Sequence, residues 1–590
     1  MKPPFWTRYL ILSTICALVA LGVIIQMVRI QSIPGAKEIM AQSELYAGVK
    51  ETIYPSRGNI YDRGGYLLAG NETTYEVGLD LLQIIDPETI ATVTTTILGL
   101  DYKETLVYAK TRSGENARYY IVLTDFVSSD KIEQLNILKE EYANRPKQKN
   151  EVRPSLAGLI WNAHTKRSYP EGDLASNLIG FFGFLDRKEG HGFFGVEESY
   201  NDLLTGTPKE IYMASDPQLV EALPEIPAGA SLVLTIDREI QAMTETVLKN
   251  AVNWSGAEAG TIIISDPRDG AILAMATTPR LDPNKYWEYD EIFPKPTPFN
   301  RAVSKSYEPG SVFKVITMAA ALDKGIVEPD TLFYDPGYIE VGGSYIYNWN
   351  GGAWGDQDMI GCLQHSLNVC LAWVATELGE KDFYKYLEDF GFNRNTGIDL
   401  AGEIHWPLRV PGDNQWFEVD LGTNSFGQGI AVTPIQMVMA ISALANEGKM
   451  MAPHIVKSMI INNHQYEINP VVVGTPIKAG TAETITHMLT VSLQEESSNA
   501  LIDGYEIAGK TGTAEIPTEF GYTNETTNTS FVGWGPTDNP QFLVYVWLEK
   551  PSISIWGSDV AAPVFREIVQ NLVILLDIPP DAVRQNLTAE

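Results

Sequence analysis

The sequence predicts an α+β protein with an N-terminal transmembrane helix, a mixed domain and then an antiparallel sheet flanked by helices. Three observations support this fold class. The 590 residues exceed what one hydrophobic core usually serves, and the apolar content of 44% excludes a disordered chain. A long uncharged stretch stands near the N-terminus. In the second half, two groups of strand-like segments enclose more than two hundred residues of mostly helical pattern, which indicates an antiparallel sheet with inserted helices.

The uncharged stretch is a candidate membrane span. YLILSTICALVALGVIIQMV, residues 9–28, has twenty residues without a charge, and a helix needs about 20 to cross the apolar part of a bilayer. A cleaved signal peptide usually has a shorter apolar core, so we favour an uncleaved anchor. Lys2 and Arg8 favour a cytoplasmic tail at 1–8, although basic residues on the other flank weaken this bias. We therefore expect a single pass in the cytoplasmic membrane, with most of the chain on the extracytoplasmic side.

Charge and cysteine content exclude several classes of partner and site. The formal net charge of -31 argues against nucleic acid, which rewards basic surfaces with counterion release. Cys362 and Cys370 would stand about 12 Å apart along one helix, too far for a disulfide. Cys16 lies in the span, and the seven histidines show no metal-ligand spacing. We therefore expect no disulfide, no metal and no cofactor.

The region after the span, residues 40–225, is predicted to be a mixed domain. It contains SRGNIYDRGG, a strand-like TYEVGLDLL and a charged helical stretch, DKIEQLNILKEEYANR. Arg57, Asp62 and Arg63 have the charges for a buried or interdomain ion-pair set, so we assign them an architectural role. An acidic segment at 218–226 precedes a turn, a short strand and an amphipathic helix in PAGASLVLTIDREIQAMTETVL. We place the domain boundary near this segment.

The second domain, residues 257–575, opens with a predicted β-hairpin. TIIISDPRDGAILAMATTP has two apolar runs separated by a turn sequence. Three further strands are predicted near the end, in IAGKTGTAEIP, TSFVGWGPT and FLVYVWLEK, followed by a helix in PVFREIVQNLVILL. Together these segments form the predicted antiparallel sheet.

A serine and a lysine stand one turn apart in YEPGSVFKVITMAAALDKG. Residues at i and i+3 of a helix share a face, so Ser311 and Lys314 are a possible nucleophile and base. Gly310 places the serine near a helix N-terminus, where free amides and the macrodipole favour developing negative charge. An apolar stripe then continues to Gly325, which can end the helix in a left-handed cap. In isolation, such a pair is more often an N-cap serine beside a solvated lysine.

Two further motifs change this interpretation. Ser366-Leu367-Asn368 and Lys510-Thr511-Gly512-Thr513 follow in the chain, and the three motifs in this order resemble the SxxK, SDN and KTG signature of penicillin-binding proteins and serine β-lactamases, with leucine in place of the central aspartate. YEPGSVFK, SRGNIYDRGG, YPEGDLASNLIGFFG, GFFGVEESYNDLLTG and FGQGIAVTPIQM are each similar to segments of class B penicillin-binding proteins. From anchor to C-terminus the chain resembles this family of monofunctional peptidoglycan D,D-transpeptidases.

The resemblance implies a fold, a substrate and partners. Residues 40–225 would form a pedestal, similar to the dimerisation domain of penicillin-binding proteins, and residues 257–575 a penicillin-binding, serine β-lactamase-like transpeptidase domain. The substrates would be peptidoglycan stem peptides ending in D-Ala-D-Ala and carried on lipid-linked nascent glycan. β-Lactams would be inhibitors, and a separate membrane glycosyltransferase would be a partner.

The residue types themselves fit a serine acyl-enzyme. Ser311 needs a base, and Lys314 can serve if desolvation and the ammonium of Lys510 lower its pKa. Ser366 and Asn368 would point about 200° apart on a helix, so the backbone must leave helical form there. We place Ser366 in a loop just before a helix or at its cap, where it would relay a proton to the leaving amine. Asn368 would orient Lys314 or the substrate amide.

The third motif would bind the substrate. By resemblance, the backbone N–H groups of Ser311 and Thr513 would form the oxyanion hole. Lys510, Thr511 and Thr513 are candidates for binding the terminal carboxylate of the stem, and Gly512 would let the substrate approach the strand closely. His365 is interpreted as a packing or surface residue. The aromatic loop YNWNGGAWGD at 347–356 could stack substrate or be purely structural, and the sequence leaves both open.

Two other classes stay open beside the transpeptidase. A hydrolase of the same fold, a β-lactamase or a D,D-carboxypeptidase, would release the acyl group to water, and Glu308 could be brought close to Ser311. A non-catalytic β-lactam sensor or scaffold would be indicated by a damaged motif or a cytoplasmic domain, and about eight residues precede the span. Anchor and pedestal favour the transpeptidase, which would crosslink stem peptides with release of D-Ala during division or elongation.

Overall fold

The computed structural model describes residues 5–31, 49–111, 119–145, 153–185, 189–213, 226–518 and 521–588. The chain divides into two compact units, 1–56 with 205–229, and 57–204 with 230–590. Lys2, one basis of the predicted orientation, and most of the segment 218–226, the basis of the predicted domain boundary, lie outside the described residues.

The first unit contains the predicted span. Helix α1 (Phe5–Gln31) includes Tyr9–Ile30, which has a mean hydropathy of 2.5 and is exposed throughout. This helix is long and apolar enough to cross a membrane, in agreement with the predicted span at 9–28. In the same unit, β1 (Val49–Ile53) pairs antiparallel with β8 (Lys209–Met213).

A five-stranded antiparallel sheet forms the centre of the second unit. Its strand order is β11-β10-β22-β21-β20, so β20 is an edge strand. The strands are β10 (Ala259–Ser265), β11 (Ile272–Thr277), β20 (Ala508–Thr518), β21 (Gly521–Gly535) and β22 (Phe542–Glu549). The predicted hairpin and the three predicted C-terminal strands are therefore confirmed.

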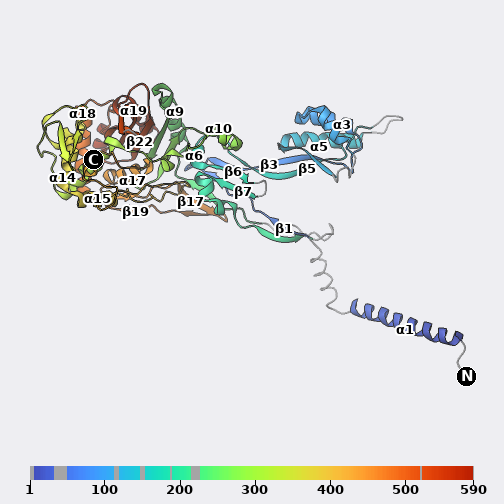
Figure 1. The fold of residues 1–590 in the computed structure, drawn as a ribbon. Helices are drawn as coiled ribbons and strands as arrows, with labels where there is room; N and C mark the ends of the chain where they lie inside the picture. Colours follow the sequence, from blue (N-terminus) through green and yellow to red (C-terminus); the bar gives the residue numbers. More distant parts are fainter. Residues whose placement is uncertain are drawn as a thin grey trace. The chain divides into compact units, whose positions relative to one another are not determined.

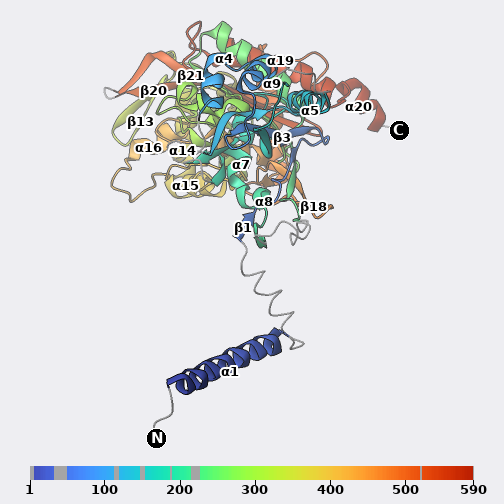
Figure 2. The ribbon, with the colours of Figure 1, turned by 90° about the vertical axis from the view of Figure 1, so that its right-hand side faces the viewer.

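Both faces of this sheet are covered, and the alternation of β10 shows how. Ile262 and Ile264 pack in a core with α9 (Arg238–Ser255) and α19 (Gly557–Leu575), while Ile263 packs in the core on the opposite face. Figures 1 and 2 show α9 and α19 side by side. Continuous apolar runs such as TIIIS are expected for strands buried on both faces.

A second sheet joins strands from the two halves of the sequence. Its order is β18-β17-β9-β2-β3-β4, and β5 also pairs with β3. The short β2 lies parallel to β9, which follows it by more than 160 residues. The strands are β2 (Ile60–Tyr61), β3 (Leu67–Asp80), β4 (Tyr120–Val127), β5 (Leu159–Ser168), β9 (Ser231–Leu234), β17 (Val456–Ile461) and β18 (His464–Glu467).

The remaining helices belong to both halves of the sequence. Those of the N-terminal half are α3 (Pro87–Leu98), α4 (Tyr102–Ala109), α5 (Ser129–Asn144), α6 (Ser176–Ile179), α7 (Gly195–Ser199) and α8 (Asn201–Thr205). Those of the C-terminal half, besides α9 and α19, are η3 (Pro283–Glu288), α10 (Tyr289–Ile292), α11 (Arg301–Ser304), η4 (Gly310–Phe313), α12 (Lys314–Lys324), α13 (Met359–Gln364), α14 (Asn368–Leu378), α15 (Glu380–Asp389), α16 (Glu418–Asn424), α17 (Pro434–Ala445), α18 (Ala479–Glu495) and α20 (Asp581–Thr588). Helix α5 confirms the charged helix that the sequence predicts.

Small two-stranded sheets complete the fold. They pair β6 (Phe181–Leu185) with β7 (Glu189–Phe193), β12 (Phe333–Asp335) with β15 (Gly355–Gln357), β13 (Tyr338–Val341) with β14 (Ser344–Tyr347), and β16 (Met450–Met451) with β19 (Val472–Gly474). The pair β13–β14 matters for the site because the loop after β14 leads to Trp349.

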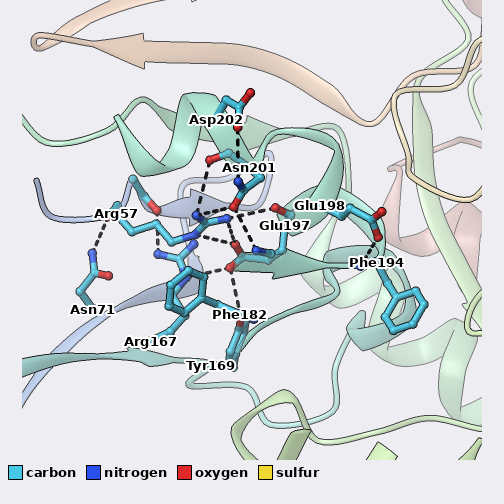
Figure 3. A network of polar contacts seen from close by, with 12 residues as sticks. Arg57, Asn71, Arg167, Tyr169, Phe182, Phe194, Glu197, Glu198, Asn201 and Asp202 are labelled. Atoms are coloured by element: carbon cyan, nitrogen blue, oxygen red, sulfur yellow. Dashed lines mark hydrogen bonds and ion pairs between the residues drawn. The ribbon is translucent and has the colours of Figure 1, made fainter. Parts of the chain in front are cut away.

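A buried ion network has the architectural role predicted for Arg57 (Figure 3). Glu197 is fully buried, and its carboxylate accepts hydrogen bonds from Arg57 Nε at 2.8 Å and from Arg167 Nε at 2.7 Å. Tyr169 also donates to this carboxylate, at 3.1 Å. Asp62 is not part of the network, because its carboxylate accepts backbone N–H groups of its own turn. The network ties the SRGN segment to β5 and α7.

The structure contradicts the prediction that Cys362 and Cys370 stay unpaired. They form a disulfide with a Cα–Cα distance of 6.0 Å. The excluded distance of about 12 Å assumed one continuous helix. Instead α13 ends at Gln364, Ser366 has a φ of 52°, and α14 begins at Asn368. This break brings the two cysteines together.

Candidate active site

Ser311 lies in the short 3₁₀ turn η4, which leads directly into α12. Gly310, with a φ of 61°, precedes it, and a Cβ there would lie 2.7 Å from Thr513 O. The N–H of Gly310 donates to Gly427 O at 3.0 Å, and a Cβ on Gly427 would lie 2.4 Å from Gly310 O. Glycine is therefore required at both positions, and the FGQG segment holds the serine turn against β20.

Helix α12 confirms the predicted pattern after the serine. Val315, Met318 and Ala319 are fully buried. Gly325 ends the helix in the left-handed region with a φ of 75°. These contacts fix the helix from which Lys314 projects.

Lys314 is fully buried and is held by the second motif. Its Nζ donates to Ser366 O at 2.6 Å, to Ser366 Oγ at 3.1 Å and to Asn368 Oδ1 at 2.8 Å. Burial, and then the positive charge of Lys510, lower the pKa of Lys314 well below 10.5. Both causes are those expected from the sequence, because low dielectric and a like charge disfavour the ammonium form.

Ser366 and Asn368 meet Lys314 because the chain is not helical between them. Ser366 is in the left-handed region, Leu367 is the extended N-cap of α14, and Asn368 is its first residue. Asn368 also donates from Nδ2 to Tyr347 O at 3.2 Å, so both ends of its carboxamide are used. The predicted loop position of Ser366 is confirmed.

The third motif lies on the edge strand β20. Lys510 is buried, and its Nζ donates to Thr511 O at 3.3 Å and to Thr511 Oγ1 at 3.2 Å. Burial lowers the pKa of Lys510 to about 8, with Glu496 opposing the shift. Thr511 and Thr513 are half-buried, whereas Gly512 between them is buried.

Gly512 and Thr513 are in close contact with neighbouring elements. A Cβ on Gly512 would lie 2.2 Å from Ser530 Oγ and 2.8 Å from Val312 Cγ1. The missing side chain is thus required by the packing of η4 on β20, a reason that the sequence did not give. Thr513 Oγ1 accepts the N–H of Gly557, the first residue of α19, at 3.1 Å.

Two neighbours have contacts that clarify their roles. His365 stacks on Trp354 with ring centroids 4.3 Å apart, which agrees with a packing role. Glu308 accepts a hydrogen bond from Tyr522 OH at 3.1 Å, and burial raises its pKa. Among the described residues, no group of three or more His, Cys, Asp or Glu could hold a metal ion.

Sequence reasoning missed the backbone supports of the site. Gly427 and Gly557 contact Gly310 and β20 through atoms that carry no side-chain chemistry. The signal available for Gly427 was the FGQG segment, whose resemblance was noted without a role. Nothing local in the sequence indicates Gly557.

The comparisons with known proteins agree with this arrangement. The family described as penicillin binding protein transpeptidase domain matches residues 260–570, more than half of the chain. The penicillin-binding protein dimerisation domain matches residues 52–218. The chain belongs to the class B penicillin-binding proteins.

Individual relatives cover most of this class B penicillin-binding protein. It is 31% identical over 543 residues to Stage V sporulation protein D of Bacillus subtilis, covering 89% of this chain and 79% of that protein. It is 26% identical over 584 residues to the peptidoglycan D,D-transpeptidase FtsI of Escherichia coli, covering 96% and 92%. A crystal structure of penicillin binding protein 3 from Mycobacterium tuberculosis, complexed with aztreonam, aligns with a TM-score of 0.67 at 24% identity, covering 90% of this chain and 98% of that one.

The family assignment confirms several predictions from the sequence. The α+β fold class and the enzyme class, a serine-type peptidoglycan transpeptidase of cell-wall synthesis, are confirmed. The apolar helix α1 in a class B penicillin-binding protein indicates a single-pass membrane protein with a large soluble part. The roles of the individual site residues stay predictions.

Proposed function

We propose that this protein crosslinks stem peptides through an acyl-enzyme on Ser311. The serine Oγ attacks the carbonyl of the D-Ala-D-Ala bond, and the terminal D-Ala leaves as the amine. An amine of a neighbouring stem then attacks the ester, forms the crosslink and returns the serine hydroxyl. The observation that carries this proposal is a fully buried Lys314, one turn from Ser311, with its pKa lowered well below 10.5.

Lys314 is the proposed general base. A serine hydroxyl is a weak nucleophile until its proton is removed, and a lysine can remove it only when neutral. The lowered pKa of Lys314 favours the neutral amine that this role requires.

Ser366 is proposed to relay the proton, and Asn368 is proposed to orient Lys314. The 3.1 Å contact between Lys314 Nζ and Ser366 Oγ offers a path for the proton toward the leaving amine, because a hydroxyl can both accept and donate. Asn368, fixed at both ends of its carboxamide, holds Lys314 in place.

The edge strand β20 is the proposed binding strand for the stem peptide. An extended peptide can add to an exposed strand edge through main-chain hydrogen bonds. Lys510, Thr511 and Thr513 would bind the terminal carboxylate, and the N–H groups of Ser311 and Thr513 would stabilise the oxyanion. Loss of one such donor typically costs about 2.7–4 kcal/mol of barrier.

The domain roles and the membrane setting belong to the same proposal. Residues 40–225 would form the pedestal and residues 257–575 the transpeptidase domain, with the first residues cytoplasmic and the remainder extracytoplasmic. Anchored beside the membrane, the enzyme would act on lipid-linked nascent glycan made by a separate membrane glycosyltransferase. The apolar α1 supports this setting because it has the length and hydropathy of a span.

Labelling with penicillin tests the nucleophile. The purified full chain in detergent should form one covalent adduct, mapped by peptide mass spectrometry to Ser311. Ser311→Ala should retain the thermal unfolding temperature of the parent and give no adduct. An adduct on another residue, or labelling of the alanine variant, would contradict the assignment.

The lifetime of the adduct separates transpeptidase from hydrolase. Glu308 is engaged by Tyr522 and is the acid closest in sequence to the nucleophile, so a hydrolase would use it to activate water. We expect an adduct that lasts many minutes and a Glu308→Gln variant with the same lifetime. Turnover of excess penicillin within seconds, lost in Glu308→Gln, would replace the transpeptidase by a β-lactamase.

A further inference from the structure

The aromatic loop after β14 is tied to the second motif at two points. Trp349 Nε1 donates to the carbonyl of His365, the residue before Ser366, at 3.2 Å. Two residues earlier, the carbonyl of Tyr347 accepts from Asn368 Nδ2 at 3.2 Å. A displacement of this loop therefore displaces the backbone that carries Ser366 and Asn368.

A second tryptophan is tied to the third motif. Trp556 is the N-cap of α19, and the N–H of the next residue, Gly557, donates to Thr513 Oγ1 at 3.1 Å. A Cβ on Gly557 would lie only 2.2 Å from Gly512 O, so this backbone rests directly on β20. A displacement of β20 would therefore also displace Trp556.

The two indole rings meet. Their centroids are 5.1 Å apart and the ring planes cross at 72°, an edge-to-face geometry. The rings are not part of a core, since Trp349 is 50% and Trp556 37% exposed, whereas Trp534 and Trp547 are fully buried. Their contact joins two segments that are separate in sequence and that each hold one catalytic motif.

We propose that Trp349 and Trp556 are positioning residues that set the separation between Ser366 and Thr513 during acylation. The aromatic pair acts as a strap from the serine-asparagine loop to β20, and so aligns the proton relay with the oxyanion hole. This inference rests on the proposed function of Ser311, Ser366 and Thr513. Neither indole has to touch the substrate for this role.

The physical basis is alignment rather than binding. Reacting groups must be held in near-attack geometry, and a small misplacement caused by residues away from the chemistry can lower the rate strongly. An aromatic pair contributes enough interaction energy to bias a loop position, but too little to determine whether the chain folds. The strap should therefore affect the acylation step and leave affinity and fold nearly unchanged.

Acylation kinetics of the full chain in detergent can test the strap. The rate of labelling by a fluorescent penicillin, measured over a range of concentrations, separates the acylation rate constant from the dissociation constant. Trp349→Ala and Trp556→Ala should each lower the rate constant about three- to tenfold, with the dissociation constant changed less than about twofold. The double variant should lose no more than either single variant, because both remove the same contact.

Conservative variants and a matched control complete the test. Trp556→Phe retains a ring and should recover most of the rate constant, whereas Trp349→Phe also loses the Nε1 donor to His365 O and should recover less. Trp287→Ala, which removes another exposed edge-to-face ring from its contact with Tyr286 at 5.7 Å, should change nothing. An unchanged rate constant in both alanine variants would overturn the strap, and so would a loss confined to the dissociation constant, which would make the rings ligand contacts. If the parent chain is not labelled at all, the proposed function fails, a result distinct from failure of the strap.

Discussion

Two buried charged side chains in the same unit, Glu197 and Lys314, differ in whether the neighbouring charges are opposite to or like their own. Glu197 is fully buried between the guanidinium groups of Arg57 and Arg167 (Figure 3). Lys314 is also fully buried, but the charge acting on its pKa is the like charge of Lys510. Glu197 and Lys314 are equally buried and both have positive neighbours, but these neighbours are opposite in sign to Glu197 and like in sign to Lys314.

The sign of the neighbouring charge relative to the buried group determines whether that group stays charged. Burial alone would raise the pKa of Glu197, yet Arg167 and Arg57 outweigh burial and hold this pKa below 4.5, so the carboxylate stays charged. Around Lys314 both effects act in one direction and favour the neutral amine. The buried charge with opposite partners therefore holds segments together, whereas the like charge beside Lys314 favours the neutral amine that the proposed base needs.

The largest expected effect is on catalysis, from removal of the base. Lys314→Ala should lower the rate of acylation by penicillin about 10²- to 10⁴-fold, the usual contribution of general acid–base catalysis. Lys314→Arg should restore little, because a guanidinium stays protonated. Stopped-flow labelling of the full chain measures both rates.

The same variants also test the contrast in stability. Loss of Lys314 removes hydrogen bonds to the uncharged oxygens of Ser366 and Asn368, so it should lower the thermal unfolding temperature less than loss of the ion-paired Glu197 does. Near-normal acylation by the arginine variant would mean that Lys314 acts only as a positive charge, and the distinction between the two clusters would disappear.

The next effect is on stability, from breaking the paired cluster. Glu197→Ala leaves two buried guanidinium groups without their carboxylate and should cost about 3–5 kcal/mol of unfolding free energy. Glu258→Ala is the matched control, because Glu258 pairs with Lys550 at the surface with 63% of its side chain exposed, and such pairs contribute about 0–1 kcal/mol.

Urea unfolding followed by tryptophan fluorescence measures these losses. The fraction of Glu197→Ala that remains folded should still be acylated at Ser311 at the parental rate. Equal losses in the two variants would show that the paired cluster has no special architectural role.

The smallest effect concerns the disulfide Cys362–Cys370, which encloses Ser366 and Asn368 in its loop and carries no charge. Replacing Cys362 and Cys370 by serine opens a short loop, and the chain-entropy estimate for such a loop is about 2–3 kcal/mol. Burial and the charge of Lys510 are the causes that lower the pKa of Lys314, and serines at both positions leave Lys510 in place, so acylation should fall much less than in Lys314→Ala. A loss of acylation as large as that of Lys314→Ala would make the disulfide, rather than buried charge, the main support of the base.

The sequence predicts the site better than it predicts what surrounds the site. The placement of Ser311 one turn before Lys314, the loop position of Ser366 and the cap at Gly325 each follow from local helical geometry. The disulfide was missed in the same segment, because its exclusion assumed a continuous helix that the argument about Ser366 had already interrupted. A helix that is interrupted at Ser366 cannot also hold Cys362 and Cys370 about 12 Å apart.

Other features depend on contacts that local patterns do not encode. Glu197 is the partner of Arg57 across 140 residues, and β2 pairs with β9 across the domain boundary predicted near 218–226. Gly427 and Gly557 support the site through backbone contacts alone. Such long-range pairings leave no periodicity for a single sequence to reveal.

The dependence of acylation on pH tests the central claim most directly. Because burial and Lys510 lower the pKa of Lys314 well below 10.5, the neutral amine should form at a much lower pH than for an ordinary lysine, so the rate constant should rise and level off well below pH 10.5. It should then fall above about pH 8, where Lys510 loses the charge that binds the substrate carboxylate. Lys510→Arg should remove this upper limb, since its guanidinium stays charged. A rate constant that is negligible at neutral pH and rises steadily toward 10.5, the ordinary value for lysine, would contradict the account.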